Sequence, residues 1–142
     1  MSAINRSLQN PVSGQDADTK AARDAAITAA KVYDIASFCS GAPIASQILL
    51  RMIMVRQVIL PVSLTGSKAT IGTNPTGALV VAFAQSGSAS VTGQVSFSTS
   101  GVPTFTLASQ MTLAIGDVLT FTAPASPDAT GANIGITLMG TI

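Results

Sequence analysis

The chain has 142 residues, a length that suits one sizeable hydrophobic core and is short for two. Its net charge is +1 and its seven Lys and Arg residues are scattered singly, so neither nucleic acid nor a membrane is expected as a main partner. Histidine and glutamate are absent, and the single cysteine, Cys39, cannot form an internal disulfide or a cysteine-rich zinc site. The composition predicts no cofactor and no metal. Cys39 is interpreted as a small buried hydrophobe, with a reactive thiol as the alternative.

No segment has the pattern of a secretory signal or a membrane span. The start, Met1 to Val12, is polar and is broken by Pro11. The most apolar stretch, Ile48 to Leu60, contains Arg51 and Arg56 and is shorter than the roughly 20 mostly apolar residues that a span needs. We therefore expect the protein to be made and kept in the cytoplasm unless it leaves within a larger particle.

The N-terminal region carries most of the charge, eight of the thirteen charged side chains, together with a run of alanines. A helix is expected to begin near Asp16 or Asp18, either of which suits a cap, and to run to about Lys31. Alanine buries little area, so such a helix is marginal alone, and an extended arm that orders on a neighbour is the alternative. The pattern predicts an arm at residues 1–40 and a folded domain at residues 41–142.

The remainder of the chain has the pattern of short strands separated by turns. The segment Gln47 to Leu60 has apolar residues on both faces and is predicted to be one long strand buried on both sides. Leu79 to Ala84 is a continuous apolar run, expected at an exposed sheet edge, and Val91 to Ser98 alternates cleanly. Further alternating strands are predicted within 104–107, 111–115, 118–123 and 134–142. These strands predict an all-β fold, a jelly roll, β-sandwich or barrel of about eight strands, with an N-terminal helical or extended arm.

The aspartates of the strand region are explained by turn chemistry. Gly116-Asp117 suits a tight reversal between neighbouring strands, and Asp128 belongs to a proline-bounded loop. A carboxylate pair of Asp117 and Asp128 is the remaining option for hydrolysis, and nothing in their spacing favours it. Lys68 lies in a Gly/Ser loop and is interpreted as a solvated turn residue, because a reactive lysine requires burial or a cationic neighbour. The sequence therefore predicts no enzyme and no catalytic residue.

Charge is scarce beyond Gln57, where only Lys68, Asp117 and Asp128 are charged. A free soluble domain is charged at roughly a quarter of its residues, because charge keeps it dispersed. The Ser and Thr residues of the strands have two interpretations. They are ordinary solvent-facing strand residues, or they form uncharged faces that dock on other proteins without the cost of desolvating charges. The scarcity of charge favours docking.

The two ends of residues 33–142 carry a family resemblance. The motifs are Tyr33-Asp34-Ile35, Gly41-Ala42-Pro43, Leu50-Arg51, Arg56, Leu60-Pro61, the stretch Ala114 to Ala125, Asp128-Ala129-Thr130 and the stretch Ile134 to Thr141. They resemble a β-rich domain that recurs in virion proteins of tailed bacteriophages. In size and character the chain is similar to capsid-cementing (decoration) proteins of these phages, such as that of a short-tailed Bordetella phage. The resemblance implies a jelly roll on the capsid exterior that joins major capsid proteins.

The leading hypothesis is therefore a structural virion protein, assembled in the host cytoplasm, that cements a phage capsid and forms a homodimer or another symmetric oligomer. Its expected partners are the major capsid protein and itself. The arm is expected to reach a neighbour, with charged contacts at Arg6, Lys20, Arg23 and Lys31. The alternative is a phage tail or fibre attachment, or a receptor-binding module, although one tyrosine and no tryptophan supply little for sugar stacking.

Overall fold

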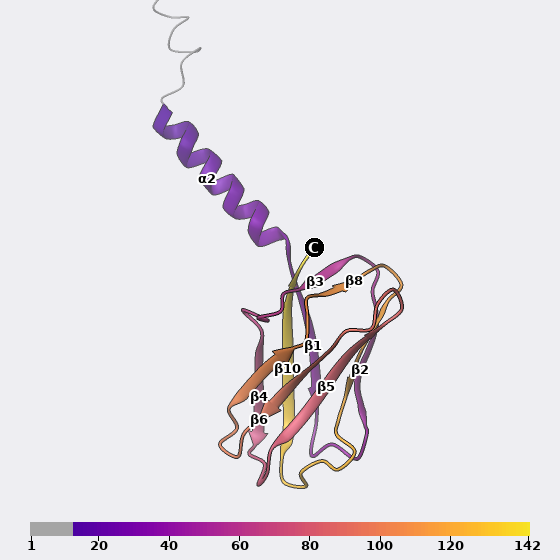
Figure 1. The fold of residues 1–142 in the computed structure, drawn as a ribbon. Coiled ribbons are helices and arrows are strands. Elements are labelled where there is room, and N and C mark those ends of the chain that lie inside the picture. The colour runs from indigo at the N-terminus through magenta and orange to yellow at the C-terminus, as the bar shows by residue number, and fades with distance from the viewer. Residues whose placement is uncertain (1–12) are drawn as a thin grey trace, which may run out of the picture. The chain divides into compact units, whose positions relative to one another are not determined.

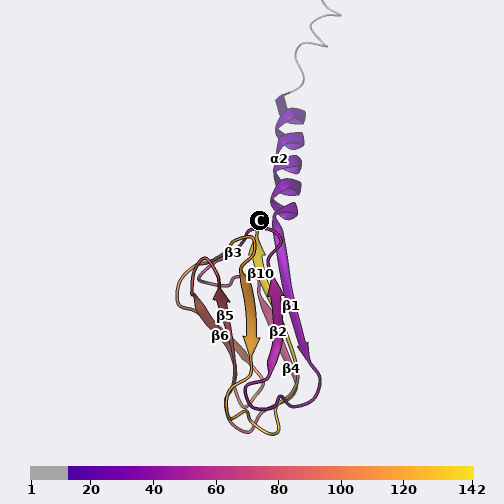
Figure 2. The same cartoon turned by 90° about the vertical axis from the view of Figure 1, so that its right-hand side faces the viewer.

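The computed structural model describes residues 13–142 of the chain, which divides into two units, Met1–Val32 and Tyr33–Ile142. The described part of the first unit contains helix α2 (Ser13–Ala30). The second is built from ten strands, drawn in Figures 1 and 2: β1 (Val32–Cys39), β2 (Ile48–Ile53), β3 (Val58–Leu60), β4 (Lys68–Thr73), β5 (Leu79–Ser86), β6 (Thr92–Phe97), β7 (Pro103–Leu107), β8 (Met111–Leu113), β9 (Val118–Thr122) and β10 (Ala132–Thr141). The predicted all-β class is confirmed, with ten strands in place of the predicted eight or so; of the two forms predicted for the N-terminal arm, helical or extended, the structure has a helix at Ser13–Ala30.

The N-terminal segment is helical rather than extended. Helix α2 begins at Ser13, so Asp16 and Asp18 lie inside it and not at its start, where a cap was predicted. Residues 19–29 are all exposed, and Lys20 forms an i,i+4 ion pair with Asp24. Such a surface pair contributes only about 0.3–0.5 kcal/mol. The helix therefore owes its formation mainly to the high propensity of its alanines.

The β unit begins at Tyr33 rather than after Ser40, where the arm was predicted to end. The reason is strand β1, in which Ile35 and Cys39 alternate inward and join the core. Cys39 is buried and free, as expected for a small apolar residue.

The strands form two five-stranded antiparallel sheets that pack face to face (Figures 1 and 2). Sheet A has the order β1-β10-β3-β8, with β4 also paired to β10, and sheet B has the order β2-β9-β5-β6-β7. The first strand thus neighbours the last, and the second neighbours the last but one. The core lies between the sheets and includes Phe83, Phe97 and Phe121, each at most 1% exposed. Burying side chains of this size contributes roughly 1.5–3 kcal/mol each.

The predicted single strand from Gln47 to Leu60 is wrong. It is two strands, β2 in sheet B and β3 in sheet A, and the chain changes sheets between them at Met54. The Met54 N–H donates to the Asp117 carbonyl at 2.8 Å, and the Met54 carbonyl accepts from the Gly116 N–H at 2.8 Å. The segment has apolar residues on both faces because β2 packs on the core from sheet B, whereas β3 packs on the core from sheet A.

Two further local predictions are corrected by the topology. Gly116-Asp117 does not close a hairpin, because β8 belongs to sheet A and β9 to sheet B. The chain crosses between the sheets there, with Gly116 at φ 90°. Leu79 to Ala84 is not a sheet edge either, since β5 lies between β9 and β6 in the middle of sheet B. Its continuous apolar run reflects a central strand.

Candidate docking surface

The outward-facing residues of sheet B form a nearly neutral surface of the β unit. Side chains that are paired across antiparallel strands share a face, so the strand register identifies the outward set. It consists of Ile48, Arg51 and Ile53 on β2; Val118, Thr120 and Thr122 on β9; Val80, Ala82, Ala84 and Ser86 on β5; Thr92, Gln94 and Ser96 on β6; and Thr104 and Thr106 on β7. We refer to this set as the sheet B face.

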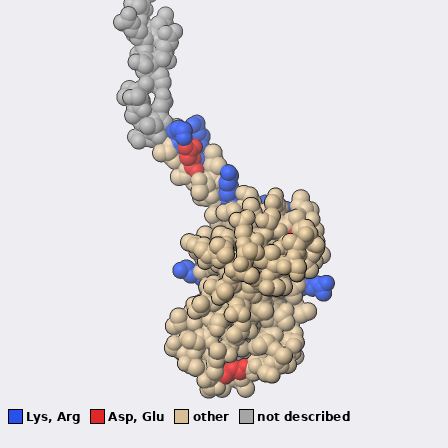
Figure 3. Space-filling view, viewed as in Figure 1, with Lys and Arg blue, Asp and Glu red and all other residues tan. Residues whose placement is uncertain are grey.

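The sheet B face is uncharged except at one edge. Its only charged member is Arg51, on edge strand β2, while β9, β5, β6 and β7 contribute hydroxyl, amide and small apolar side chains. Figure 3 shows one side of the molecule, on which blue and red atoms are sparse over the β unit. A partner that covers such a surface has few charges to desolvate, and hydroxyls can exchange water for protein acceptors.

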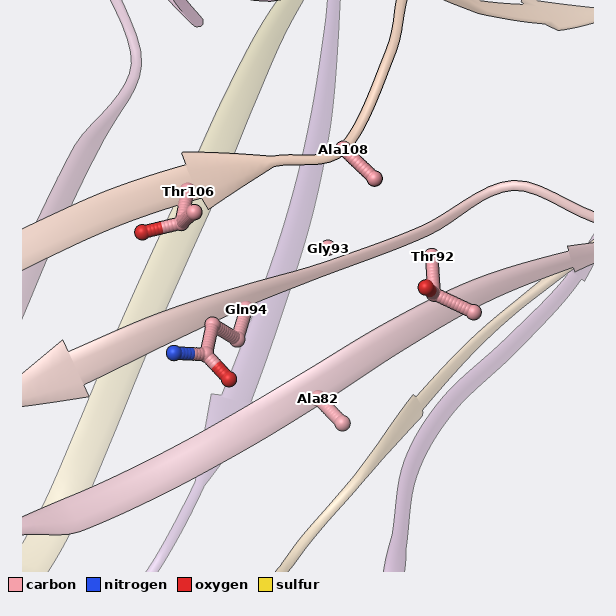
Figure 4. Close-up of a pocket in the computed structure, with 6 residues that line it drawn as sticks. All are labelled: Ala82, Thr92, Gly93, Gln94, Thr106 and Ala108. Atoms are coloured by element: carbon pink, nitrogen blue, oxygen red, sulfur yellow. The ribbon is translucent and has the colours of Figure 1, made fainter.

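A shallow depression of about 390 Å³ lies on the sheet B face. It is lined by Ala82, Thr92, Gly93, Gln94, Thr106 and Ala108, which come from β5, β6, β7 and the residue after β7 (Figure 4). Its polar groups are two hydroxyls and one amide, and it contains no aromatic ring and no ionisable side chain. The depression can accept a small protruding side chain or a backbone segment, but it offers no catalytic group.

An apolar patch begins at Ile53, on the edge of the sheet B face, and extends beyond that face where the two chain crossings lie side by side. Ile53 is 65% exposed, and Val55 and Ile115 are each 74% exposed. The hydrogen bonds between Met54 and the Gly116-Asp117 segment bring these side chains to one corner of the sandwich. Three large exposed apolar side chains at one corner suit a contact with another protein. We refer to them as the corner patch.

Asp117 holds this corner together. It is only 3% exposed and accepts four hydrogen bonds, from Ser88 Oγ at 2.5 Å, Ser88 N at 2.7 Å, Gln85 Nε2 at 2.7 Å and Ala114 N at 2.8 Å. The Ser88 hydroxyl is the largest cause, followed by the Ser88 N–H, of a pKa held well below the ordinary range. Gln85 is itself 2% exposed and also donates to the Thr112 carbonyl at 2.7 Å. Asp117 therefore joins segments of both sheets.

Asp128 performs the same task in a second, separate network. One carboxylate oxygen accepts from Thr76 N, Thr76 Oγ1 and Gly77 N, and the other from Thr130 N, Thr130 Oγ1 and Gly131 N. The Thr130 hydroxyl, then the Thr76 hydroxyl, hold the pKa of this carboxyl well below its ordinary value. Asp128 thus fastens the loop after β4 to the loop before β10. Asp117 is bonded at the end of β5 and Asp128 is bonded just before its start, so the two aspartates lie at opposite ends of this eight-residue strand and do not form a hydrolytic pair.

The described residues offer little else to chemistry. Within residues 13–142 no cluster of three His, Cys, Asp or Glu residues is placed to hold a metal ion. The same part of the chain contains no helix with the length and apolar character to cross a membrane.

The predicted arm contacts are only partly placed by the structure. Arg6 lies outside the described residues, while Lys20 and Arg23 are exposed on α2 and Lys31 is exposed just after it. Lys20 is engaged with Asp24 on its own helix. The corner patch was not predicted from the sequence, because the exposure of Val55 and Ile115 depends on where the chain crosses between sheets.

Comparison of the chain with protein-family models, with curated proteins and with solved structures finds no match in any of the three. Its function is therefore inferred from the surface just described and from the motifs in its sequence. The most informative features are the neutral sheet B face and the corner patch beside it.

Proposed function

We propose that the chain is a structural virion protein that binds the outer surface of a phage capsid and cements neighbouring major capsid proteins. The observation that carries this proposal is the sheet B face, on which four of five strands contribute no charge. An isolated soluble domain lacks a reason to keep so large a surface neutral, whereas a docking surface benefits from it. The phage capsid as the partner comes from the resemblance of the sequence motifs.

The size of the sheet B face supports a two-part contact. Five strands about 4.8 Å apart and six residues long cover about 20 Å by 20–24 Å, or roughly 400–480 Å² in projection. A standard interface buries about 800 Å² on each partner. In projection the face therefore covers about half of that figure, although the relief of its side chains makes its accessible area larger than its projection. The corner patch and the N-terminal unit are the natural sources of the remainder, so we assign them to contacts with a neighbouring subunit.

Avidity completes the mechanism. A cement protein is present in many copies, and a symmetric oligomer of this chain would bind several capsid subunits at once. The second contact of each oligomer is then intramolecular, so overall binding exceeds the affinity of any one contact by a factor of about 10²–10⁴. A modest contact per subunit therefore suffices to hold a shell.

We further propose that the sandwich is a jelly roll. The nested neighbours β1 with β10 and β2 with β9 support this assignment, because a jelly roll folds a long hairpin so that its outer strands pair first with last. Viral capsid and lectin domains commonly have this architecture. The fold suits a shell protein, but it does not select one by itself.

A pair of matched variants tests the docking surface. Ala82→Lys places a charge at the centre of the sheet B face, and Thr70→Lys places the same charge on exposed strand β4 of sheet A. Burying an unpaired charge costs several kcal/mol, so Ala82→Lys is expected to weaken binding to purified capsids by at least about tenfold. Thr70→Lys is expected to bind as the wild type does. Equal binding by both variants, measured by co-sedimentation, would show that the sheet B face is not the contact.

A further inference from the structure

The charged residues within the strands occupy a particular set of positions. Asp34, Arg51 and Lys68 are the charged residues of the ten strands, and they lie on β1, β2 and β4. Each of these three strands pairs with one neighbour only, so each is a sheet edge. The interior strands β10, β3, β9, β5 and β6 contain no charged residue. Charge within the β unit is thus confined to the edges.

The two remaining edge strands are protected in other ways. Strand β7 begins with Pro103, which has no N–H to donate to a ladder, and β8 is only three residues long. Charges, prolines and short length are the devices by which sheet proteins keep their edges from pairing with other chains. Each of the five edges therefore has one of them.

A neutral β-sandwich needs such protection more than an ordinary one does. An edge strand exposes free N–H and C=O groups, and repulsion between whole molecules is weak at a net charge of +1. A strand that covers such an edge must desolvate its charge, and in a two-fold antiparallel pair that charge also meets its own copy when the pairing is centred near it. A charge on an edge therefore disfavours the pairing.

We propose that Asp34, Arg51 and Lys68 prevent edge-to-edge pairing of strands between copies of this chain, so that copies associate through the faces of their sheets instead. All three side chains are exposed, and none makes an ion pair within the described residues. The proposal does not depend on the capsid as partner. It concerns pairing between copies of the β unit, whatever the faces bind.

The sign of the charge provides a sharp test. Arg51→Thr and Lys68→Thr lower the net charge from +1 to 0, and Asp34→Thr raises it from +1 to +2. Lys31→Thr is the matched control, because it also lowers the net charge to 0 but lies outside the strands. Threonine favours strands, so the substitutions suit the fold. A second variant, Arg51→Asp, keeps a charge on the β2 edge.

Sedimentation velocity, together with thioflavin fluorescence, measures the protein concentration above which each purified full-length variant forms assemblies larger than the wild-type species. All three edge variants are expected to form these assemblies at concentrations lower than the wild type by up to about fivefold, because cross-strand terms reach about 1 kcal/mol per pair. Lys31→Thr and Arg51→Asp are expected to behave as the wild type. Growth of Lys31→Thr equal to that of Arg51→Thr, or wild-type behaviour of the edge variants, would overturn the proposal.

Discussion

Gly93 packs so closely against the aromatic core that Gly93→Ala is predicted to destabilise the fold. A Cβ at this position would lie 2.3 Å from Phe83 Cζ and 2.8 Å from the Thr106 carbonyl oxygen, whereas ordinary contact begins at 3.4 Å. The Phe83 ring is 1% exposed and packs against Phe121 with centroids 5.7 Å apart. Neither the ring nor the backbone oxygen has free space to move into. The added methyl must therefore displace the core or spread β6 from β7.

The expected cost of Gly93→Ala is about 2–3 kcal/mol, at the upper end of the range for overpacked cores. For a domain of this size that loss lowers Tm by about 10 °C or more. Gly135→Ala is the control, because its nearest heavy atom is the Thr70 Cγ2 at 3.3 Å, a side-chain methyl that can give. Thermal and guanidinium unfolding of the purified variants measures both effects, and we expect Gly135→Ala to stay within about 1 kcal/mol of the wild type.

A double-mutant cycle identifies the cause. Phe83→Leu shortens the side chain that the new methyl meets, so Gly93→Ala combined with Phe83→Leu should be less destabilised than the sum of the single changes by about 1 kcal/mol or more. Strict additivity would refute the steric explanation. So would a Gly93→Ala variant as stable as Gly135→Ala.

Two other predictions follow from the networks and the two units. Hydrogen-bond donors lower the folded-state pKa of Asp117 and Asp128 below the unfolded value of about 3.9, so the stability that these carboxylates contribute is complete above about pH 5 and is lost as the pH falls. The free energy of unfolding should therefore drop from pH 5 to pH 2, and Asp117→Asn should reduce the steepness of that drop. An unchanged pH dependence in Asp117→Asn would contradict the role given to Asp117. Deletion of residues 1–30 leaves β1 whole, so the truncated chain should unfold cooperatively with nearly the wild-type Tm. It should nevertheless lose capsid binding, because the arm is expected to contact a neighbouring subunit. Undiminished binding in co-sedimentation would exclude the arm as a contact.

Local patterns in the sequence predicted the strands well where each strand stays in one sheet. The alternation from Val91 to Ser98 is strand β6, with Val95 and Phe97 buried and Thr92 and Gln94 exposed. Pattern failed between Gln47 and Leu60, because the change of sheet at Met54 depends on hydrogen bonds to Asp117, far along the chain. No local signal reports such a partner.

The location of the candidate docking surface could not be predicted from the sequence. Scarce charge beyond Gln57 indicated uncharged faces, and the strand pairing then identified sheet B as the face with a single charge at its edge. The role of Asp117 was underestimated, since its turn position was visible while its bonds to Gln85 and Ser88 were not. The confinement of strand charges to edges likewise becomes visible only once strand order is known.

The proposed function is tested most directly by the number of copies of this chain in purified virions. Staining of virion proteins separated on a gel, quantified against the major capsid protein, gives that ratio. A cement protein that covers joints between capsid subunits is predicted to be present at a level comparable with the major capsid protein, because every joint of the shell offers a site. A ratio of a small fraction would instead indicate a tail or fibre attachment, and absence from the particle would contradict a virion role altogether.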